Sequence, residues 1–368
     1  MAKKAKRPAL EFLRTGPAQY VNRAGILRRA GACIAPWGNR ALISGGKKAL
    51  EAAEEPLVKS LSKSGIVCRR HLFSGEASLS NAAKVKKEAQ ALGANVIIGV
   101  GGGKSLDTAK QAAADLGLPL VCIPTIAATC AASTALSVIY NDRGEFYRDH
   151  VHPRNPSLVL VDPEVLTRAP DMYLRAGILD SMAKWFEGRS VYPYVPNPDL
   201  QTNMAIHLAE VLYQGHRKHA LEAVHLNSEG RLGYDLSQTL DLVLLLTGVI
   251  QTLAKGTLFT AVAHPLHNGL TVMEESRGVL HGLKVGYGII VQLWIEKRPK
   301  KEFEDVLYFF RQLGLEPSLQ GLNLPSDPEI IRRVAEKAAG NAERGPLGYP
   351  VNNVVIERAM RELEQRLA

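Results

Sequence analysis

Residues 95–110, NVIIGVGGGKSLDTAK, constrain the fold most: an apolar run breaks into three consecutive glycines and resumes as an amphipathic helical pattern. Because glycine has no Cβ, a backbone through Gly101, Gly102 and Gly103 can take positive φ and approach a ligand closely. The unpaired N–H groups of the following helix would face that ligand. The pattern is neither GxGxxG nor the Walker pattern, which needs a longer loop before its GK[ST] ending. It therefore predicts either a nucleotide diphosphate site or a tight strand-to-helix turn.

Strand-like and helix-like segments alternate through the first 165 residues. Apolar, β-rich runs cover residues 40–44, 66–72, 95–100, 120–123, 136–140 and 158–161, with helical patterns at 48–63, 81–92 and 105–116. The turn residues at 141–144 predict a hairpin after the run at 136–140. This alternation predicts a Rossmann-like α/β nucleotide-binding domain over residues 1–165, with a parallel sheet covered by helices.

Helical periodicity takes over after about Pro170. Examples are residues 200–214, 236–254, 280–296, 301–313, 328–339 and 353–367, so we predict an all-helical domain over residues 166–368. Ligands of open α/β sheets bind beyond the carboxyl ends of the strands. We therefore expect the active site where the helical domain closes over the three glycines.

Composition narrows the partners that this chain can have. Its 368 residues are 46% hydrophobic and 22% charged, with no apolar run of eighteen residues and no secretory signal pattern. We expect a cytoplasmic protein with no membrane partner and with reduced thiols. The net charge of +9 suits anionic cofactors or substrates. Lys3, Lys4, Lys6 and Arg7 have no accompanying recognition motif, so we expect a solvated, disordered terminus and no nucleic-acid partner.

Three polar residues of the helical half are candidate metal ligands. They are Asp180 in RAGILDSMAKWFEG, His264 in AVAHPLHNGL and His281 in VLHGLKVGYG. One carboxylate and two imidazoles with an open position suit a catalytic divalent metal that polarises a substrate oxygen. Spacing alone favours an ordinary interpretation for each of them, as a helix-surface acid or as core or helix-end histidines.

Five motifs stand in the order that is typical of one enzyme superfamily: GVGGGKSLDTAK (99–110), PTIAATCAASTALSVIYNDRGEF (124–146), AGILDSMAKWFE (176–187), HPLHNGLTV (264–272) and HGLKVGYG (281–288). Over nearly its whole length the chain resembles the iron-containing alcohol dehydrogenase superfamily, in its glycerol-dehydrogenase-like branch. The resemblance implies a dehydroquinate-synthase-like fold and metal ligands at Asp180, His264 and His281. The implied dinucleotide contacts are Gly103, Lys104, Thr125, Thr134, Leu136 and Tyr140, and the glycine motif also presents Gly101, Gly102 and Asp107.

Lys184 is the first departure from the family pattern. Iron-dependent relatives have a histidine ligand at the fourth residue after the metal-binding aspartate, and an ammonium cannot replace it. Three protein ligands favour zinc, with iron and manganese as alternatives. Lys184 shares the helix face of Asp180. It is predicted to bind a substrate carboxylate in the pocket; the alternative is a salt bridge with Asp180 or a surface lysine.

Cys130 is the second departure. Glycerol dehydrogenases have an aspartate there that orients polyol hydroxyls, and a thiol removes both that acceptor and its repulsion of acids. Together with Lys184 and Trp185, this feature is similar to the hydroxycarboxylate dehydrogenase A subgroup, which reduces 2-oxo acids. We interpret Cys130 as a substrate-contacting pocket wall; the alternative, a nucleophile, lacks an identifiable base.

The third departure is at the position directly after the strand pattern ALISG. NAD-dependent glycerol dehydrogenases have an aspartate there, which binds the hydroxyls of the adenosine ribose. Here Gly46 or Lys47 occupies that position. Without the carboxylate, and with Lys47 and Lys48 nearby, NADP(H) is favoured over NAD(H). The alternative is that both lysines open a helix and face water.

The resemblance implies metal-assisted hydride transfer between NADP(H) or NAD(H) and a small-molecule substrate, a 2-hydroxy or 2-oxo carboxylate or a related alcohol. His267, three residues after His264, would relay the proton or orient His264. An NAD-dependent glycerol dehydrogenase is the alternative. Two other functions are disfavoured. A dehydroquinate-synthase-type lyase would have glutamate at the position of Asp180. A non-enzymatic nucleotide-sensing or nucleic-acid-binding protein would not need the metal ligands. Apolar faces in the helical half suit a homo-oligomer.

Overall fold

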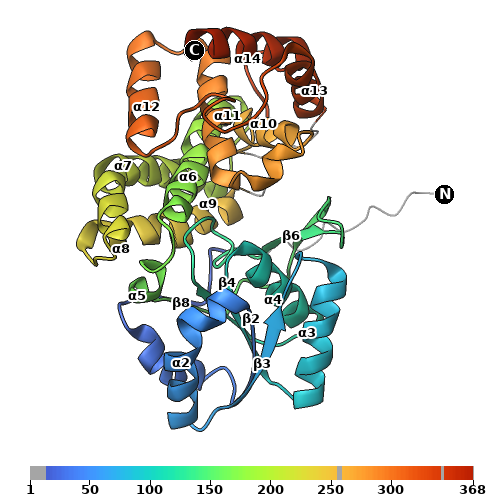
Figure 1. Ribbon diagram of the computed structural model, residues 1–368, viewed down its shortest axis with the longest axis vertical. Helices are drawn as coiled ribbons and strands as arrows, with labels where there is room; N and C mark the ends of the chain where they lie inside the picture. Colours follow the sequence, from blue (N-terminus) through green and yellow to red (C-terminus); the bar gives the residue numbers. More distant parts are fainter. Residues whose placement is uncertain (1–13, 255–258, 341–343, 368) are drawn as a thin grey trace, which may run out of the picture.

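The computed structural model describes residues 14–254, 259–340 and 344–367. The basic segment at residues 3–7 lies outside them. A six-stranded parallel sheet occupies the first part of the described chain (Figure 1). Its order is β1-β8-β5-β4-β2-β3, built from β1 (Gln19–Asn22), β2 (Arg40–Gly46), β3 (Val67–Phe73), β4 (Val96–Gly101), β5 (Leu120–Pro124) and β8 (Leu158–Val161). The predicted parallel sheet is confirmed, while the short, half-polar strand β1 was not predicted.

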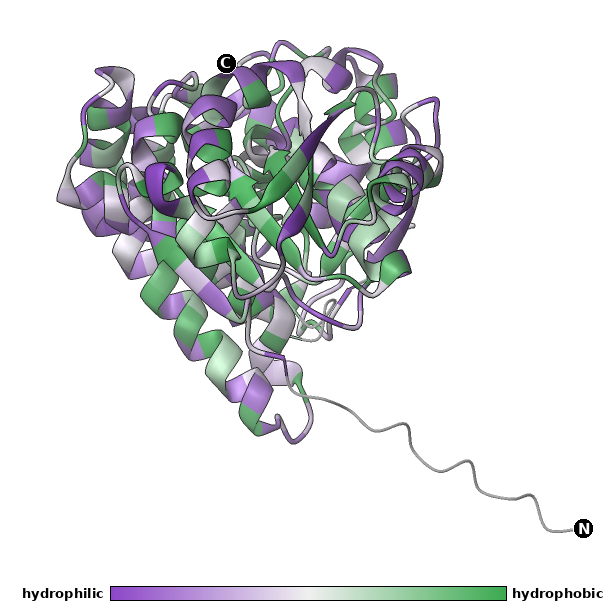
Figure 2. Cartoon of the chain, turned by 90° about the horizontal axis from the view of Figure 1, so that it is seen from below, coloured by the Kyte–Doolittle hydropathy of each residue, from purple (hydrophilic) through white to green (hydrophobic). Residues whose placement is uncertain are grey.

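Helices cover both faces of this sheet, which is why its inner strands β4, β5 and β8 are apolar runs. On one face Ile43 and Val100 pack with α1 (Ala30–Ile34) and α2 (Lys47–Lys63). On the other, Leu42 and Ile97 pack with α3 (Leu79–Leu92) and α4 (Gly103–Leu116). Figure 2 shows the hydrophobic strands inside a shell of more polar helices.

The predicted hairpin forms a separate two-stranded antiparallel sheet of β6 (Leu136–Tyr140) and β7 (Phe146–Val151). Asn141 sets the turn, since its side-chain oxygen accepts from the backbone N–H groups of Arg143 and Glu145, each at 3.0 Å. The backbone N–H of Tyr140 donates to the Ala77 carbonyl at 2.9 Å. The hairpin is thereby attached to the loop before α3, beside the first turn of α4.

The strand order reverses between β2 and β4. These strands are neighbours, with Gly45 in register with Val100, yet α2 and α4 leave them toward opposite faces. Such a topological switch point opens a crevice beyond the carboxyl ends of the two strands. Gly46 and Gly101 therefore lie at the place where an α/β sheet binds its ligand.

The rest of the described chain is helical, as predicted. It comprises α5 (Pro163–Leu166), α6 (Met172–Val191), α7 (Leu200–Ser228), α8 (Tyr234–Asp241), the π-helical turn η3 (Leu242–Leu246), α9 (Thr247–Leu253), α10 (Ala263–Leu270), α11 (His281–Ile295), α12 (Lys300–Gln312), α13 (Pro328–Ala339) and α14 (Asn353–Leu367), with 3₁₀ turns η2 (Tyr192–Tyr194) and η5 (Glu275–Gly278). A further 3₁₀ turn, η1 (Ile26–Arg29), lies in the sheet part, directly before α1.

One predicted helix, residues 236–254, is divided into three pieces by the π-helical turn. The Thr247 hydroxyl donates to the Leu242 carbonyl at 2.8 Å, an i to i+5 contact that matches the wider turn. Tyr234–Leu253 is also apolar and long enough to cross a membrane by length and composition, but half of the tested window is buried inside the protein. In this structure the segment packs along α7.

Helices α6 and α11 cross near the centre of the helical part, where Gly282 of α11 lies against α6, while Gly177 of α6 lies against the loop after β5 (Figure 1). A Cβ at Gly282 would lie 1.8 Å from the Ala176 carbonyl oxygen, and one at Gly177 would lie 2.0 Å from the Ala127 carbonyl oxygen. Neither position has room for a side chain. This close approach brings Asp180, one turn after Gly177, toward His281 beside Gly282.

Candidate active site

Asp180, His264 and His281 converge from three helices. Asp180 is buried on α6, His264 lies in the first turn of α10, and His281 begins α11. Asp180 Oδ1 is 3.1 Å from His281 Nε2 and 3.5 Å from His264 Nε2. One ligand atom from each residue lies within 4.8 Å of the others. One carboxylate oxygen and two imidazole nitrogens at this separation fit a single divalent cation with an open position.

The charges of the cluster reinforce one another. Burial alone would raise the pKa of Asp180, but His281 and His264 hold it well below its usual range. Burial alone would lower the pKa of His264, but Glu187 and Asp180 raise it to about 9. The carboxylate is therefore ionised, and a bound metal would displace the proton of His264, because a ligating histidine is neutral.

Glu187, which the sequence interpretation did not single out, lies directly behind His264. Its carboxylate is fully buried on α6 and contacts His264 Nδ1. Its other oxygen accepts from the backbone N–H groups of Ala261 and His264, at 2.9 and 3.1 Å. Because Nδ1 is occupied, His264 presents Nε2 to Asp180, the usual arrangement of a carboxylate behind a ligating histidine. Glu187 follows Asp180 by seven residues, so helical spacing could have indicated it.

Replacing Glu187 by glutamine should lower metal affinity about 10- to 100-fold, because the carboxylate orients His264 and makes it more basic. A competitive metal titration would measure the effect. Glu164→Gln is the matched control, since Glu164 pairs with exposed Arg28 far from the cluster. Unchanged metal affinity in Glu187→Gln would exclude this role.

His267 contacts a different histidine from the one predicted. Its Nε2 is 3.0 Å from His281 Nδ1, while its Nδ1 is 3.0 Å from the Asn268 side-chain oxygen. The prediction that His267 orients His264 is therefore wrong, because the ring that it contacts is that of His281. Burial, together with the neighbouring His281, holds the pKa of His267 well below its usual value, so its ring is neutral. The proton-relay interpretation stays a prediction.

Lys184 lies inside the protein, and only 9% of it is exposed. Its Nζ donates to the side-chain oxygen of Gln251 on α9. Among the described ion pairs there is none between Lys184 and Asp180, so the salt-bridge alternative is not supported, and the side chain is not on the surface. Cys130, in the loop after β5, is near enough for Lys184 and Asp180 to affect its pKa.

The Cys130 thiol is not activated. Burial raises its pKa to about 11, although the Lys184 ammonium opposes this effect. A thiol with this pKa is protonated at neutral pH, whereas a nucleophilic cysteine needs a lowered pKa. The nucleophile alternative is therefore not supported, and the pocket-wall interpretation stays a prediction.

The glycine loop has the predicted strand–loop–helix form. Gly101 ends β4 with φ of +138°, Gly102 caps α4, and Gly103 begins it. A Cβ at Gly102 would lie 2.6 Å from Ile126 Cδ1, the end of a side chain that would have to shift to admit it. The first N–H groups of α4 therefore open toward the switch point, where an anion would be stabilised.

Lys47 and Lys104 border this loop. Lys47 is exposed in the first turn of α2, and Lys104 Nζ lies 2.8 Å from Glu76 Oε1. Gly46 before Lys47 has an ordinary φ of −68°, and a Cβ there would meet only the Phe73 carbonyl, at 4.0 Å. Neither backbone conformation nor packing requires glycine at position 46. The absence of a side chain there leaves open space at the switch point.

The remaining predicted cofactor contacts surround α4. Thr125 follows the carboxyl end of β5, its N–H donating to the Gly101 carbonyl at 3.2 Å, and half-buried Tyr140 ends β6. Asp107, predicted as a cofactor contact, is buried, and its carboxylate lies 2.8 Å from Lys110 Nζ and 3.1 Å from the Val138 N–H.

Lys110 was missed by the sequence interpretation. It is almost fully buried, and its ammonium also reaches the Thr134 hydroxyl at 3.5 Å and the Leu136 carbonyl. A buried cation needs such partners. Lys110 therefore joins α4 to the segment that carries two predicted cofactor contacts.

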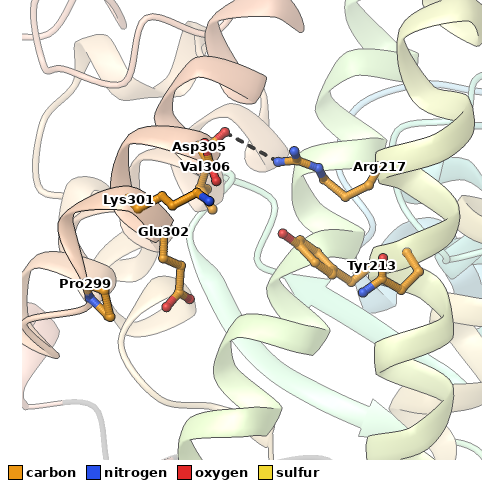
Figure 3. A pocket seen from close by; sticks show the side chains of 8 residues that line it. Tyr213, Arg217, Pro299, Lys301, Glu302, Asp305 and Val306 are labelled. Carbon is orange, nitrogen blue, oxygen red and sulfur yellow. Dashed lines mark hydrogen bonds between the residues drawn. The ribbon is translucent and has the colours of Figure 1, made fainter.

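A surface cavity of about 460 Å³ lies elsewhere, between α7 and α12 (Figure 3). Arg217 crosses it and donates to the Asp305 backbone carbonyl at 3.4 Å. Tyr213, Lys301 and Glu302 are among its lining residues. None of the predicted site residues lines it, so it is separate from the histidine cluster.

Comparisons with known proteins agree with this architecture. The family described as iron-containing alcohol dehydrogenase matches residues 17–163. The glycerol dehydrogenase of Escherichia coli O6:H1 is 35% identical, covering 89% of each chain. Hydroxycarboxylate dehydrogenase A of Escherichia coli K12 is 37% identical, covering 69% of each. The solved structure of a probable glycerol dehydrogenase from Sinorhizobium meliloti 1021 has a TM-score of 0.85 at 32% identity, covering 96% of this chain and 98% of that one. The chain belongs to the iron-containing alcohol dehydrogenase family, in its glycerol-dehydrogenase-like branch.

Proposed function

We propose that this chain is a metal-dependent oxidoreductase that transfers a hydride between NADP(H) or NAD(H) and a small 2-hydroxy or 2-oxo carboxylate, or a related alcohol. The observation that carries the proposal is the convergence of Asp180, His264 and His281 within 4.8 Å. Relatives named as alcohol-type dehydrogenases support the reaction class. An NAD-dependent glycerol dehydrogenase is the second candidate, because relatives with that name match 89% of the chain.

The residues of the site have distinct roles in this mechanism. Asp180, His264 and His281 would hold the divalent metal, which when bound supplies Lewis-acid polarisation of the substrate oxygen. Glu187 keeps His264 in the ligating orientation. His267 would pass the proton of the substrate hydroxyl toward solvent, and its contact with His281 supports this role. The first turn of α4 orients the dinucleotide diphosphate.

Charge favours an acidic substrate over a polyol. Asp180 and Glu187 supply two buried carboxylates and Lys184 supplies one buried ammonium. With neutral ligand histidines and a divalent cation, the site would have a single net positive charge. A substrate carboxylate would neutralise it, whereas glycerol would not. The Cys130 thiol, protonated at neutral pH, adds no repulsion.

A substrate panel tests this function. We expect the highest kcat/KM for 2-oxo acids when these, simple aldehydes, dihydroxyacetone and glycerol are assayed after zinc or iron loading. Lys184→Met should raise KM for 2-oxo acids about 10- to 100-fold, because a hydrogen bond to a charged group is lost. The same substitution should raise KM for neutral aldehydes by a smaller factor. Turnover of dihydroxyacetone and glycerol alone would establish the second candidate instead.

Coenzyme choice should depend on position 46. We expect the wild-type protein to use NADPH more efficiently than NADH, because Gly46 leaves space for a 2′-phosphate. Gly46→Asp should lower kcat/KM for NADPH about 100-fold, since its carboxylate would repel that phosphate and accept from ribose hydroxyls. Gly46→Ala is the control for volume without charge. A wild-type preference for NADH would overturn this assignment.

A further inference from the structure

Gln251 is the only described hydrogen-bond partner of the Lys184 ammonium. An ammonium has three N–H donors, so two of them have no partner among the described residues. This ammonium is 9% exposed, and it is near enough to the buried Glu187 carboxylate to lower the pKa of that group, but its described hydrogen-bond partner is one neutral amide. Such a group favours an anion beside it.

The orientation of Gln251 follows from the chemistry of its partner. Because an ammonium can only donate, Gln251 turns its side-chain oxygen toward Lys184. Its NH₂ group then lies beside that oxygen, and it donates to no acceptor among the described residues. Lys184 and Gln251 together present hydrogen-bond donors without an acceptor.

Helix α9 places these donors opposite the loop that carries Cys130. The Ser133 hydroxyl donates to the Leu244 carbonyl in the π-helical turn. A Cβ at Gly248 would lie 3.0 Å from Ser133 Cβ, so α9 packs tightly on this loop. Gln251 follows Gly248 by three residues and is half-buried. The π-helical turn therefore fixes the start of the helix that carries Gln251.

We propose that Gln251 is a specificity-determining residue whose amide NH₂, with the Lys184 ammonium, binds the carboxylate of a 2-oxo acid. This inference rests on the proposed function and adds a second recognition group to it. A carboxylate is an acceptor-only group with two oxygens, so it can take one donor from each side chain. An aldehyde or ketone without the carboxylate has no second group for these donors.

The test compares binding of oxamate, an unreactive carboxylate, with binding of oxamide, its neutral amide. Both are titrated by calorimetry into the metal-loaded protein with coenzyme present. We expect wild-type protein to bind oxamate more tightly. Gln251→Leu should weaken oxamate binding about 10- to 100-fold, with a smaller effect on oxamide. Gln251→Glu should weaken it further, because the new carboxylate pairs with Lys184 and repels the ligand.

The controls separate this inference from the proposed function. Gln238→Leu removes an amide from α8 and should bind oxamate as wild type does; Gln251→Asn, which withdraws the amide, replaces Gln251→Leu if that variant does not fold. If wild type prefers oxamate, and Gln251→Glu and Gln251→Leu (or its replacement Gln251→Asn) keep the wild-type affinity for oxamate, only the role of Gln251 is overturned. If wild type binds both ligands equally, the proposed substrate class fails, and the Gln251 assignment with it.

Discussion

Asp180→Asn is expected to lower kcat/KM about a thousandfold or more and to remove the bound metal. Asp180 is the only carboxylate among the three converging residues, and both histidines direct Nε2 toward its Oδ1. Asparagine keeps the shape but loses the charge that holds a divalent cation. Because Lewis-acid polarisation is worth several kcal/mol, its loss has a large effect on the rate. Metal analysis by mass spectrometry beside kinetics measures both.

The matched control for this change is Asp171→Asn at the start of the same helix. Asp171 pairs with Arg175 at 2.8 Å and is partly exposed. This variant should keep its metal and its activity. A stoichiometric metal content in Asp180→Asn, with activity near wild type, would contradict the assignment of the ligands.

Gly282→Ala should destabilise the fold by about 2–3 kcal/mol and weaken metal binding, because it overpacks the crossing of α6 and α11. The new Cβ would lie 1.8 Å from the Ala176 carbonyl oxygen, a backbone atom that cannot turn away. Separating the helices would also lengthen the 3.1 Å contact between Asp180 and His281. Urea unfolding gives the change in free energy, and a metal titration gives the change in affinity.

Gly278→Ala provides the comparison for this effect. A Cβ at Gly278 would have no atom within 4 Å, and the position lies only four residues earlier. We expect it to unfold and to bind metal as wild type does. Equal stabilities of the two variants would show that α6 and α11 can separate without cost.

Local sequence patterns predicted most of the fold. Apolar runs and turn residues placed five of the sheet strands and the hairpin, because their burial and turn chemistry are local properties. Strand β1 was missed because QYVN is short and half polar. The π-helical turn in 242–246 was missed because its hydrogen-bond shift leaves the apolar pattern unchanged. The domain boundary at residue 165 and the homo-oligomer stay predictions.

The candidate site was less accessible to sequence reasoning. Asp180 and His281 are 101 residues apart in the chain, and only the family resemblance joined them. Their approach depends on the glycine crossing of α6 and α11, which no local pattern reveals. Gln251 is 67 residues from Lys184, so the partner of that lysine could not be read from spacing. Glu187, in contrast, could have been identified from spacing, since it lies on the same helix face as Asp180.

Gly46 has a consequence for how coenzyme use can change over evolution. Its backbone is compatible with any residue, and the space beside it is open. Every glycine codon becomes an aspartate or glutamate codon through a single change at its second base. On the proposed coenzyme assignment, one point mutation at this codon would change the preferred coenzyme from NADP(H) to NAD(H). Because the backbone and packing at position 46 accept a side chain, this change would not require an unfolded intermediate.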